Sequence, residues 1–171
     1  MLDIVTPHWL VLLVALERLA ELVHARRNVT RLRAEGAIEL GADHYPFMIC
    51  LHAAWLAALW LTVPADAPIA WSWFALYLLL VAARIWVMAS LGRYWTTRIL
   101  HVPGVPLVRR GPYRFIRHPN YAVVAGEIAV LPLVFGAWQI ALIFSILNAA
   151  MLAWRIRAEN AGLATRPAAS E

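Results

Sequence analysis

The stretch that decides the fold spans residues 119–154 and reads PNYAVVAGEIAVLPLVFGAWQIALIFSILNAAMLAW. It contains two apolar runs, at about 119–135 and 137–154, with little more than Gly136 between them. Each run is close to the roughly 20 apolar residues that a helix needs to cross the hydrocarbon core of a bilayer. Because so few residues separate the runs, the stretch predicts a hairpin of two transmembrane helices.

Three further apolar runs precede the hairpin, at about residues 7–25, 45–63 and 68–91. The first is not a cleavable signal, because it lacks a basic start and is interrupted by charged residues. The chain of 171 residues is 63% hydrophobic and 15% charged, whereas a soluble domain is about half apolar and a quarter charged. We therefore predict an all-α integral membrane protein with five transmembrane helices, which form one domain over residues 1–171.

The basic residues predict the orientation of this bundle. All fifteen are arginines, and the net charge is +5. Thirteen lie in the segments after the first, third and fifth apolar runs, and none lies in the segments on the opposite side. Because cytoplasmic loops carry the basic excess, we expect the N-terminus outside and the C-terminus in the cytoplasm. Apolar runs separate the arginines, so we expect no nucleic-acid partner. An all-arginine composition is typical of GC-rich bacterial genes and favours a bacterial inner membrane.

The segment 92–118 is the candidate functional region, because it is long for a connector and rich in arginine, glycine and proline. It runs into the fourth apolar run as GPYRFIRHPNY, residues 111–121. The Gly-Pro pair predicts a turn, and the spacing predicts that Tyr113 and Arg117 share one face of a short helical turn. Pro119 suits the first position of the next helix, whose free amides attract carboxylate or phosphate groups.

A set of short matches gives this region a family resemblance. The matches are Leu107-Val108, Gly111-Pro112-Tyr113, Arg117-His118-Pro119-Asn120-Tyr121 and Arg155-x-x-x-Glu159, together with the hairpin. Over about residues 92–163 the chain resembles the isoprenylcysteine carboxyl methyltransferase family, small multispan membrane enzymes that use S-adenosylmethionine. A looser set of matches lies upstream, at Arg27-Asn28, Gly36-Ala37-x-Glu39 and His44-Tyr45-Pro46. This set is similar to a bacterial subgroup of the family, some members of which are associated with type III polyketide synthases and methylate alkylpyrones.

The resemblance implies a cofactor-binding and catalytic region at residues 92–163. The polar residues that follow predict a flexible tail at 164–171. The resemblance assigns substrate binding to Arg155. It places cofactor contacts on Val105, Pro106, Leu107, Val108, Tyr113, His118, Pro119, Asn120, Tyr121 and Glu159. Members of the family often have histidine at the position of Val105, so either His101 takes that contact or the contact is absent. No Gly-x-Gly-x-x-Gly follows a strand, so we do not expect a Rossmann-type methyltransferase.

The implied cofactor sets the chemistry that the site residues must serve. S-adenosylmethionine carries an adenine, a carboxylate and a cationic sulfur. Arg117, our second catalytic candidate, can take that carboxylate together with His118. An acceptor carboxylate or acidic enol is already ionised near neutral pH, so alignment of the reacting atoms suffices without a strong base, and Arg155 can orient the anion. We expect a lipophilic acceptor that enters from the bilayer. The resemblance implies either an isoprenylated cysteine or an alkylpyrone- or alkylresorcinol-type polyketide, and the upstream similarity favours the polyketide.

Ionisable residues inside the apolar runs are costly and usually face the bundle interior or a cavity. We expect Arg84 to pair with one of the glutamates of the other runs, Glu17, Glu21 or Glu127. In the alternative, Glu127 lines an acceptor channel. Asn148 is expected to form an interhelical hydrogen bond. The six histidines have no metal-ligand spacing, so we expect no metal site.

Four alternatives remain open at this stage. Arg155 and Glu159 are also compatible with an exposed salt bridge at a helix end, which stabilises little. The membrane helices are compatible with a phospholipid N-methyltransferase. Membrane sterol reductases, which use NADPH, have a similar C-terminal region, but they are normally longer. A non-enzymatic membrane scaffold would use its arginines for topology and lipid headgroups alone.

Overall fold

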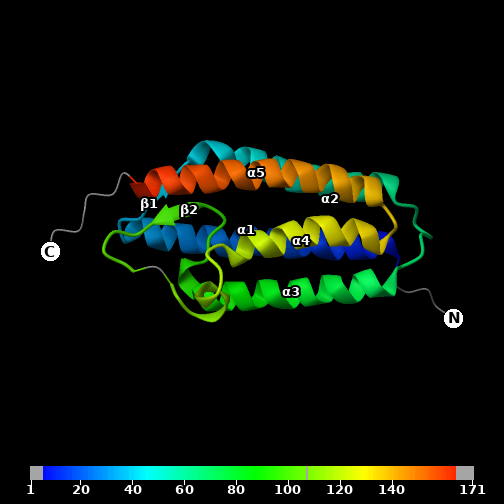
Figure 1. Ribbon diagram of the computed structural model, residues 1–171, viewed down its shortest axis with the longest axis horizontal. Helices are drawn as coiled ribbons and strands as arrows, with labels where there is room; N and C mark the ends of the chain where they lie inside the picture. Colours follow the sequence, from blue (N-terminus) through cyan, green and yellow to red (C-terminus); the bar gives the residue numbers. More distant parts are fainter. Residues whose placement is uncertain (1–5, 107, 165–171) are drawn as a thin grey trace.

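The computed structural model describes residues 6–106 and 108–164. Leu107 and the predicted tail from residue 165 onward lie outside the described residues. Within the described residues the chain forms five α-helices: α1 (Pro7–Ala34), α2 (Tyr45–Thr62), α3 (Trp71–Leu91), α4 (Pro119–Val134) and α5 (Trp138–Ala164). The helices run alongside one another as an elongated bundle (Figure 1).

Three helical stretches are long and apolar enough to cross a membrane, and they are Ala42–Thr62, Trp71–Tyr94 and Trp138–Ala161. The predicted apolar helices are thus confirmed at α2, α3 and α5. α4 is apolar but shorter, and charged residues interrupt α1. Five helices are present in the described residues, whereas the crossing of the membrane by all five stays a prediction.

α4 lies in the middle of the bundle and packs against both α3 and α5 (Figure 1). It begins at Pro119, as predicted, since a proline at a first helical position has no amide to leave unpaired. The chain turns at Gly136, which has a φ of +70°. Gly126 permits a close approach to α3, because a Cβ there would lie 2.9 Å from the Leu80 Cδ2 atom. The predicted hairpin therefore has a short, central first helix.

The first and last helices extend beyond the apolar runs that predict them. α1 continues to Ala34, so its arginines at positions 26–33 lie on a helix rather than in a loop. The sequence has no glycine or proline between Pro7 and Gly36, which has a φ of +87°, so nothing stops the helix earlier. α5 continues to Ala164, which places Arg155 and Glu159 four residues apart on one helix.

A small sheet joins two of the connecting segments, and the sequence did not predict it. Strands β1 (Ile38–Leu40) and β2 (Ile99–His101) pair antiparallel, with Glu39 opposite Leu100. The sheet lies at the end of the bundle where the segment 92–118 and the C-terminal part of α5 also lie (Figure 1). Three 3₁₀ turns complete the described structure: η1 (Ala42–His44), η2 (Gly92–Tyr94) and η3 (Gly111–Arg114).

The hydrophobic core occupies the opposite half of the bundle, toward the connection 63–70 and the Gly136 turn. It includes buried Trp55 and Leu59 of α2 and Ile128 and Leu131 of α4. The Ala70 amide donates to the Val134 carbonyl at 2.8 Å and ties the connection to the end of α4. One half of the molecule is therefore a packed apolar core, which leaves the polar residues to the other half.

Candidate functional site

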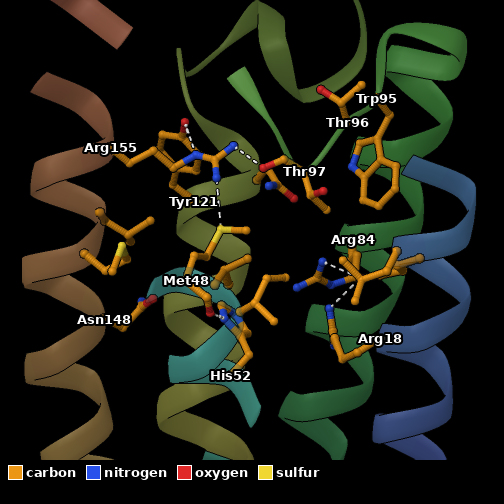
Figure 2. A pocket seen from close by; sticks show the side chains of 17 residues that line it. Arg18, Met48, His52, Arg84, Trp95, Thr96, Thr97, Tyr121, Asn148 and Arg155 are labelled. Carbon is orange, nitrogen blue, oxygen red and sulfur yellow. Dashed lines mark hydrogen bonds and ion pairs between the residues drawn. The ribbon is translucent and has the colours of Figure 1, made fainter. Parts of the chain in front are cut away.

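A cavity of about 100 Å³ lies where the five helices meet the segment 95–97. Arg155, Tyr121 and Thr97 lie toward one end of it, and Arg18 and Arg84 lie toward the other (Figure 2). Its polar lining comprises Arg18, Glu21, His52, Arg84, Thr96, Thr97, Asn120, Tyr121, Asn148 and Arg155. Its apolar lining comprises Leu22, Met48, Ile49, Trp95, Val124, Met151 and Leu152.

Arg155 of α5 is buried, with 6% of its surface exposed, and its guanidinium has three partners. Its Nε donates to the Tyr121 hydroxyl at 2.9 Å, and its Nη2 donates to the Thr97 carbonyl at 2.8 Å. Its Nη1 contacts the Met48 sulfur at 2.9 Å. The guanidinium is therefore fixed at the cavity wall by groups from α2, α4 and the segment 95–97 (Figure 2).

Tyr121 links Arg155 to a carboxylate. Its hydroxyl accepts from Arg155 and donates to Glu159 Oε2 at 3.0 Å. His118 stacks on the Tyr121 ring, with centroids 4.9 Å apart and planes 4° apart, and its Nδ1 lies 3.7 Å from Glu159 Oε2. We call these four residues the Arg155 cluster. Among the described residues Arg155 and Glu159 are joined through Tyr121, not by a direct ion pair, so the pair is not merely a helix-end salt bridge.

The segment that carries Thr97 is held in place by other side chains. Asn28 of α1 donates to the Trp95 carbonyl at 2.8 Å. The Tyr45 hydroxyl lies 3.1 Å from Thr97 Oγ1, and the Arg98 guanidinium lies 4.0 Å from the centroid of the Tyr45 ring. These contacts fix the position of the Thr97 carbonyl, and through it the orientation of Arg155.

Tyr113 lies in η3, close to the Arg155 cluster. Burial raises the pKa of its phenol, and the neighbouring Tyr121 and Glu159 raise it further, so the hydroxyl stays protonated and can donate a hydrogen bond. Tyr113 also lines a second, more open depression of about 390 Å³. The other residues of this depression are Arg109, Arg114, Phe115, Ile116 and Arg117.

The prediction that Tyr113 and Arg117 share one face of a helical turn is wrong. The 3₁₀ turn ends at Arg114, since the amides of Phe115 and Ile116 both bond to the Pro112 carbonyl and the chain then leaves the helix. Arg117 is exposed outside the turn and lines the second depression rather than the cavity.

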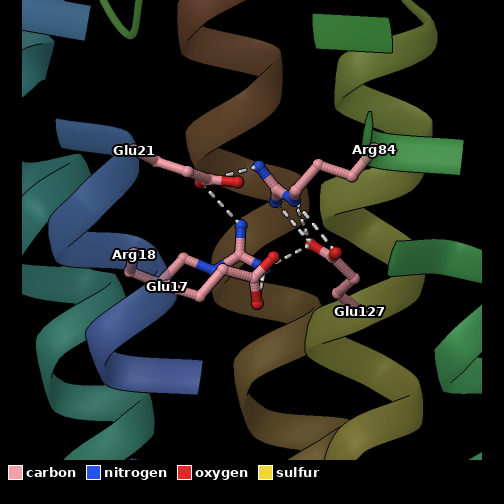
Figure 3. Close-up of polar contacts among 5 residues, drawn as sticks. All are labelled: Glu17, Arg18, Glu21, Arg84 and Glu127. Carbon is pink, nitrogen blue, oxygen red and sulfur yellow. Dashed lines mark hydrogen bonds and ion pairs between the residues drawn. The ribbon is translucent and has the colours of Figure 1, made fainter. Parts of the chain in front are cut away.

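Five charged residues form an ion network at the other end of the cavity (Figure 3). Arg84 of α3 pairs with Glu127 of α4 through both carboxylate oxygens, with Nε at 2.9 Å and 3.0 Å, and its Nη1 donates to Glu21 Oε2 at 3.1 Å. Arg18 donates to the same Glu21 oxygen at 3.0 Å and lies 3.2 Å from Glu127. Glu17 is more exposed and lies 3.8 Å from Arg18. The predicted pairing of Arg84 is confirmed.

The structure brings some of the predicted site residues together and leaves others apart. Arg155, Tyr121 and Asn120 line the cavity, and His118 and Glu159 touch them as described. Pro119 is buried at the start of α4. Of the described residues predicted to bind the cofactor, seven do not line the cavity: Val105, Pro106, Val108, Tyr113, His118, Pro119 and Glu159. His101 pairs with Ile38 in the small sheet, and it does not line the cavity either.

Two features of the cavity differ from the sequence analysis or were missed by it. The expected hydrogen bond of Asn148 to another helix is wrong: the side chain is buried, lines the cavity and has no hydrogen-bond partner among the described residues. Met48 and Thr97, which hold Arg155, were not predicted. Thr97 acts through its main-chain carbonyl, which any residue has, so no residue type marked this position.

Comparison with family models matches residues 73–165 to the isoprenylcysteine carboxyl methyltransferase family. The chain belongs to this family. The matched residues include most of α3, all of α4, the segment 92–118 and the Arg155 cluster, so this cluster lies within the part that defines an isoprenylcysteine carboxyl methyltransferase, whereas the cavity residues of α1 and α2 lie outside the match. This membership and the apolar helices support the assignment of the chain to the membrane methyltransferases.

One curated relative extends the similarity to nearly the whole chain. The uncharacterized protein YpbQ of Bacillus subtilis (strain 168) is 41% identical over 161 residues, which cover 91% of this chain and 95% of the relative. The two proteins therefore match over α1 and α2 as well as over the family region. No solved structure matches the chain.

Proposed function

We propose that the protein is an S-adenosylmethionine-dependent O-methyltransferase that acts on a carboxylate or enol oxygen of a lipophilic acceptor. The single observation that carries the proposal is the Arg155 cluster at the wall of a cavity inside an apolar bundle. A buried guanidinium with a fixed orientation is suited to bind one anionic oxygen. Family membership supplies the reaction class.

The residues around the cluster fit the chemical groups of S-adenosylmethionine. This cofactor supplies an activated methyl group on a cationic sulfur. Glu159 offers a carboxylate to its amine or ribose, and the protonated Tyr113 offers a donor. Asn120 adds a buried Oδ1 atom that has no hydrogen-bond partner among the described residues. The arginines of the second depression, which include Arg117, offer positive charge to its carboxylate.

Arg155 is proposed to orient the acceptor. An ionised acceptor needs no strong base, so the contribution of the protein is to hold the oxygen in line with the methyl group. The apolar walls provided by Met48, Ile49, Val124 and Met151 suit a hydrocarbon chain next to that oxygen. The acceptor would reach them from the bilayer. The similarity to alkylpyrone-methylating proteins favours a polyketide acceptor over an isoprenylated cysteine.

We further propose that all five helices cross the membrane, with the N-terminus outside and the site facing the cytoplasm. α4 rises about 24 Å over its 16 residues, and its burial between α3 and α5 makes a longer apolar surface unnecessary. The arginines of the segment 92–118 and of the C-terminal half of α1 lie toward the same end of the bundle (Figure 1). This arrangement is the one that the excess of basic residues in cytoplasmic segments favours.

Isothermal titration with S-adenosylmethionine tests the cofactor assignment on the purified protein in detergent. The wild type is expected to bind, and His118→Ala and Tyr113→Ala are expected to weaken binding at least about tenfold. Arg157→Gln is the matched control, because Arg157 lies on α5 but is exposed. Absence of binding by the wild type, or unaltered binding by both alanine variants, would contradict the assignment.

A transfer assay on one lipid extract separates this function from its rivals. Tritiated methyl groups are expected in a lipophilic O-methyl product. Label in phosphatidylethanolamine would favour phospholipid N-methylation, and NADPH oxidation without label would favour a reductase. If cells that carry Arg117→Gln and Arg155→Gln keep the same methylated lipids as the wild type, a scaffold role is favoured instead.

A further inference from the structure

Glu39 joins two segments at the end of the bundle that carries the candidate site. It lies on β1 opposite Leu100 of β2, and 13% of its side chain is exposed. Its two carboxylate oxygens have different partners. Oε1 accepts from Arg98 Nη1, and Oε2 accepts from Arg33 Nη2 of α1. Glu39 therefore ties the segment before β2 to β1 and to α1.

A short path of contacts leads from Glu39 to Arg155. The Arg98 guanidinium, which donates to Glu39, lies 4.0 Å from the centroid of the Tyr45 ring. The Tyr45 hydroxyl lies 3.1 Å from Thr97 Oγ1. The Thr97 carbonyl in turn accepts from Arg155 Nη2 at 2.8 Å (Figure 2). Every step is a direct contact, so a displacement of the Arg98 side chain is expected to reach Arg155.

The backbone next to Glu39 also lies against the helix that carries Arg155. A Cβ at Gly41 would lie 2.6 Å from the Ala158 Cβ atom. The chain after β1 therefore packs directly on α5, about one turn beyond Arg155. β1 is thus supported by α5 as well as by β2, and this support makes Glu39 a fixed point from which the orientation of another residue can be set.

Loss of the Glu39 charge would change where the Arg98 side chain lies. Arg98 is 31% exposed, and Glu39 is its one ion-pair partner among the described residues. A cation–π contact at an exposed site is weak, so the Tyr45 ring alone would not hold the guanidinium, which would turn toward water. The segment 95–97 would then lose part of its support. Arg155 would keep its charge but not its fixed orientation.

We propose that Glu39 is a positioning residue for the acceptor: it holds Arg98 and, through the segment 95–97, sets the orientation of Arg155. This inference rests on the proposed function, since it takes Arg155 to bind the acceptor anion. Glu39 does not line the cavity, so it acts through the other residues alone. Because a hydrogen bond weakens steeply as its angle departs from linearity, a small displacement of Arg155 should weaken acceptor binding and leave cofactor binding unchanged.

A double-mutant cycle on the purified protein in detergent tests the proposal. The probe is 4-hydroxy-6-pentadecyl-2-pyrone, whose acidic enol is ionised near neutral pH. Its Kd is measured without S-adenosylmethionine by tryptophan fluorescence, since Trp95 lines the cavity. Glu39→Gln and Arg98→Gln should each raise this Kd about fivefold. The double variant should show the same rise, because both residues act in one path, whereas independent effects would multiply to about 25-fold.

Two matched controls separate this path from a general effect of charge at this end of the bundle. Arg33→Gln removes the other partner of Glu39 but leaves the contact with Arg98. Glu35→Gln breaks the exposed ion pair with Arg93. Both variants should keep the probe Kd within about twofold of wild type.

Isothermal titration with S-adenosylmethionine shows whether the effect is confined to the acceptor. All four single variants should bind the cofactor within about twofold of wild type. A parallel loss of cofactor and probe binding in Glu39→Gln would indicate a general structural role and overturn the proposal. Arg98→Gln keeps the test decisive if Glu39→Gln does not fold, since a wild-type probe Kd in Arg98→Gln would also overturn it.

Methyl transfer to the same probe separates this inference from the proposed function. If the probe binds and the cycle gives the expected result, but the wild type transfers no methyl group, the proposed function fails and the positioning role stands. If the wild type methylates the probe and the two effects multiply, or Glu39→Gln binds the probe as tightly as wild type, the proposed function stands and the positioning role fails. Absence of probe binding by the wild type would overturn the positioning role, because Arg155 would then hold no acceptor anion.

Discussion

The Arg155 cluster and the ion network contain buried arginines of two different kinds. Arg84 is committed to carboxylates: it binds Glu127 through both oxygens and Glu21 through one more contact. Among the described residues Arg155 has no direct carboxylate partner, and it is held by a phenol, a main-chain carbonyl and a sulfur atom. The charge of Arg84 is neutralised within the protein, whereas that of Arg155 is available to a ligand.

This difference assigns the two sites different tasks. A buried guanidinium bound to carboxylates fixes helices relative to one another, and loss of one partner leaves an uncompensated charge. A buried guanidinium without a carboxylate is poised for an anionic acceptor. Substitutions in the ion network should therefore change stability most, and substitutions in the Arg155 cluster should change activity most.

The largest effect is expected from Arg84→Met. The substitution leaves Glu127 and Glu21 with Arg18 as their one remaining guanidinium partner in the network, and breaking a buried pair in this way costs about 3–5 kcal/mol in the free energy of unfolding. Thermal unfolding in detergent should show a fall of about 6–20 °C in Tm for a chain of this size. A Tm within about 2 °C of the wild-type value would contradict a structural role of the network.

Two companion variants sharpen this result. Glu17→Gln removes the most weakly held carboxylate of the network and should change the free energy of unfolding by no more than about 0.5 kcal/mol. The double variant Arg84→Met/Glu127→Leu removes both charges of the central pair, so it should be more stable than Arg84→Met alone. We therefore expect the free energy of unfolding to decrease in the order wild type, double variant, single variant. A double variant less stable than Arg84→Met would show that uncompensated charge is not the cause.

The second effect in size is expected from Arg155→Gln. It should lower kcat/KM for the acceptor by about 100-fold, since removal of one preorganised charge at a reacting oxygen has effects of this order. Binding of S-adenosylmethionine should stay within about threefold of wild type. Arg157→Gln, exposed on the same helix, should leave both quantities unchanged. A parallel loss of cofactor binding in Arg155→Gln would place Arg155 in the cofactor site instead.

A smaller effect than that of Arg155→Gln is expected from Tyr121→Phe. This change keeps the ring that stacks on His118 but removes the hydroxyl between Arg155 and Glu159. Arg155 retains Thr97 and Met48 as partners, so kcat/KM should fall only about tenfold, which corresponds to the loss of about one hydrogen bond. Tyr45→Phe, which removes a hydroxyl one step further away at Thr97, should have a smaller effect still. An equal effect of both changes would show that the tyrosines act only by fixing the segment 95–97.

The family resemblance placed all four residues of the Arg155 cluster at the site, although it did not predict their contacts with one another. Each half of the cluster is local in the sequence. His118 directly precedes α4 and Tyr121 lies on its first turn, and Arg155 and Glu159 lie one turn apart on α5. The hairpin brings these two turns to the same end of the bundle. The start of α4 at Pro119 followed from the chemistry of proline in the same way.

The rest of the site depends on contacts between distant segments, which periodicity does not reveal. The sheet between β1 and β2 joins segments about sixty residues apart, and each strand is too short to give an alternating pattern. Asn148 was expected to pair with another helix because buried amides usually do, yet it faces the cavity. Arg117 was grouped with Tyr113 by helical spacing, but the 3₁₀ turn ends before it.

Transfer of a labelled methyl group tests the central claim most directly. Purified protein in vesicles is supplied with S-adenosylmethionine that carries a tritiated methyl group and with 4-hydroxy-6-pentadecyl-2-pyrone, an alkylpyrone with an acidic enol, as acceptor. The wild type should produce a labelled O-methyl ether, and Arg155→Gln should produce it about 100-fold more slowly at limiting acceptor. Label in the ether at equal rates in both proteins, or no labelled ether from the wild type, would contradict an O-methyltransferase centred on Arg155.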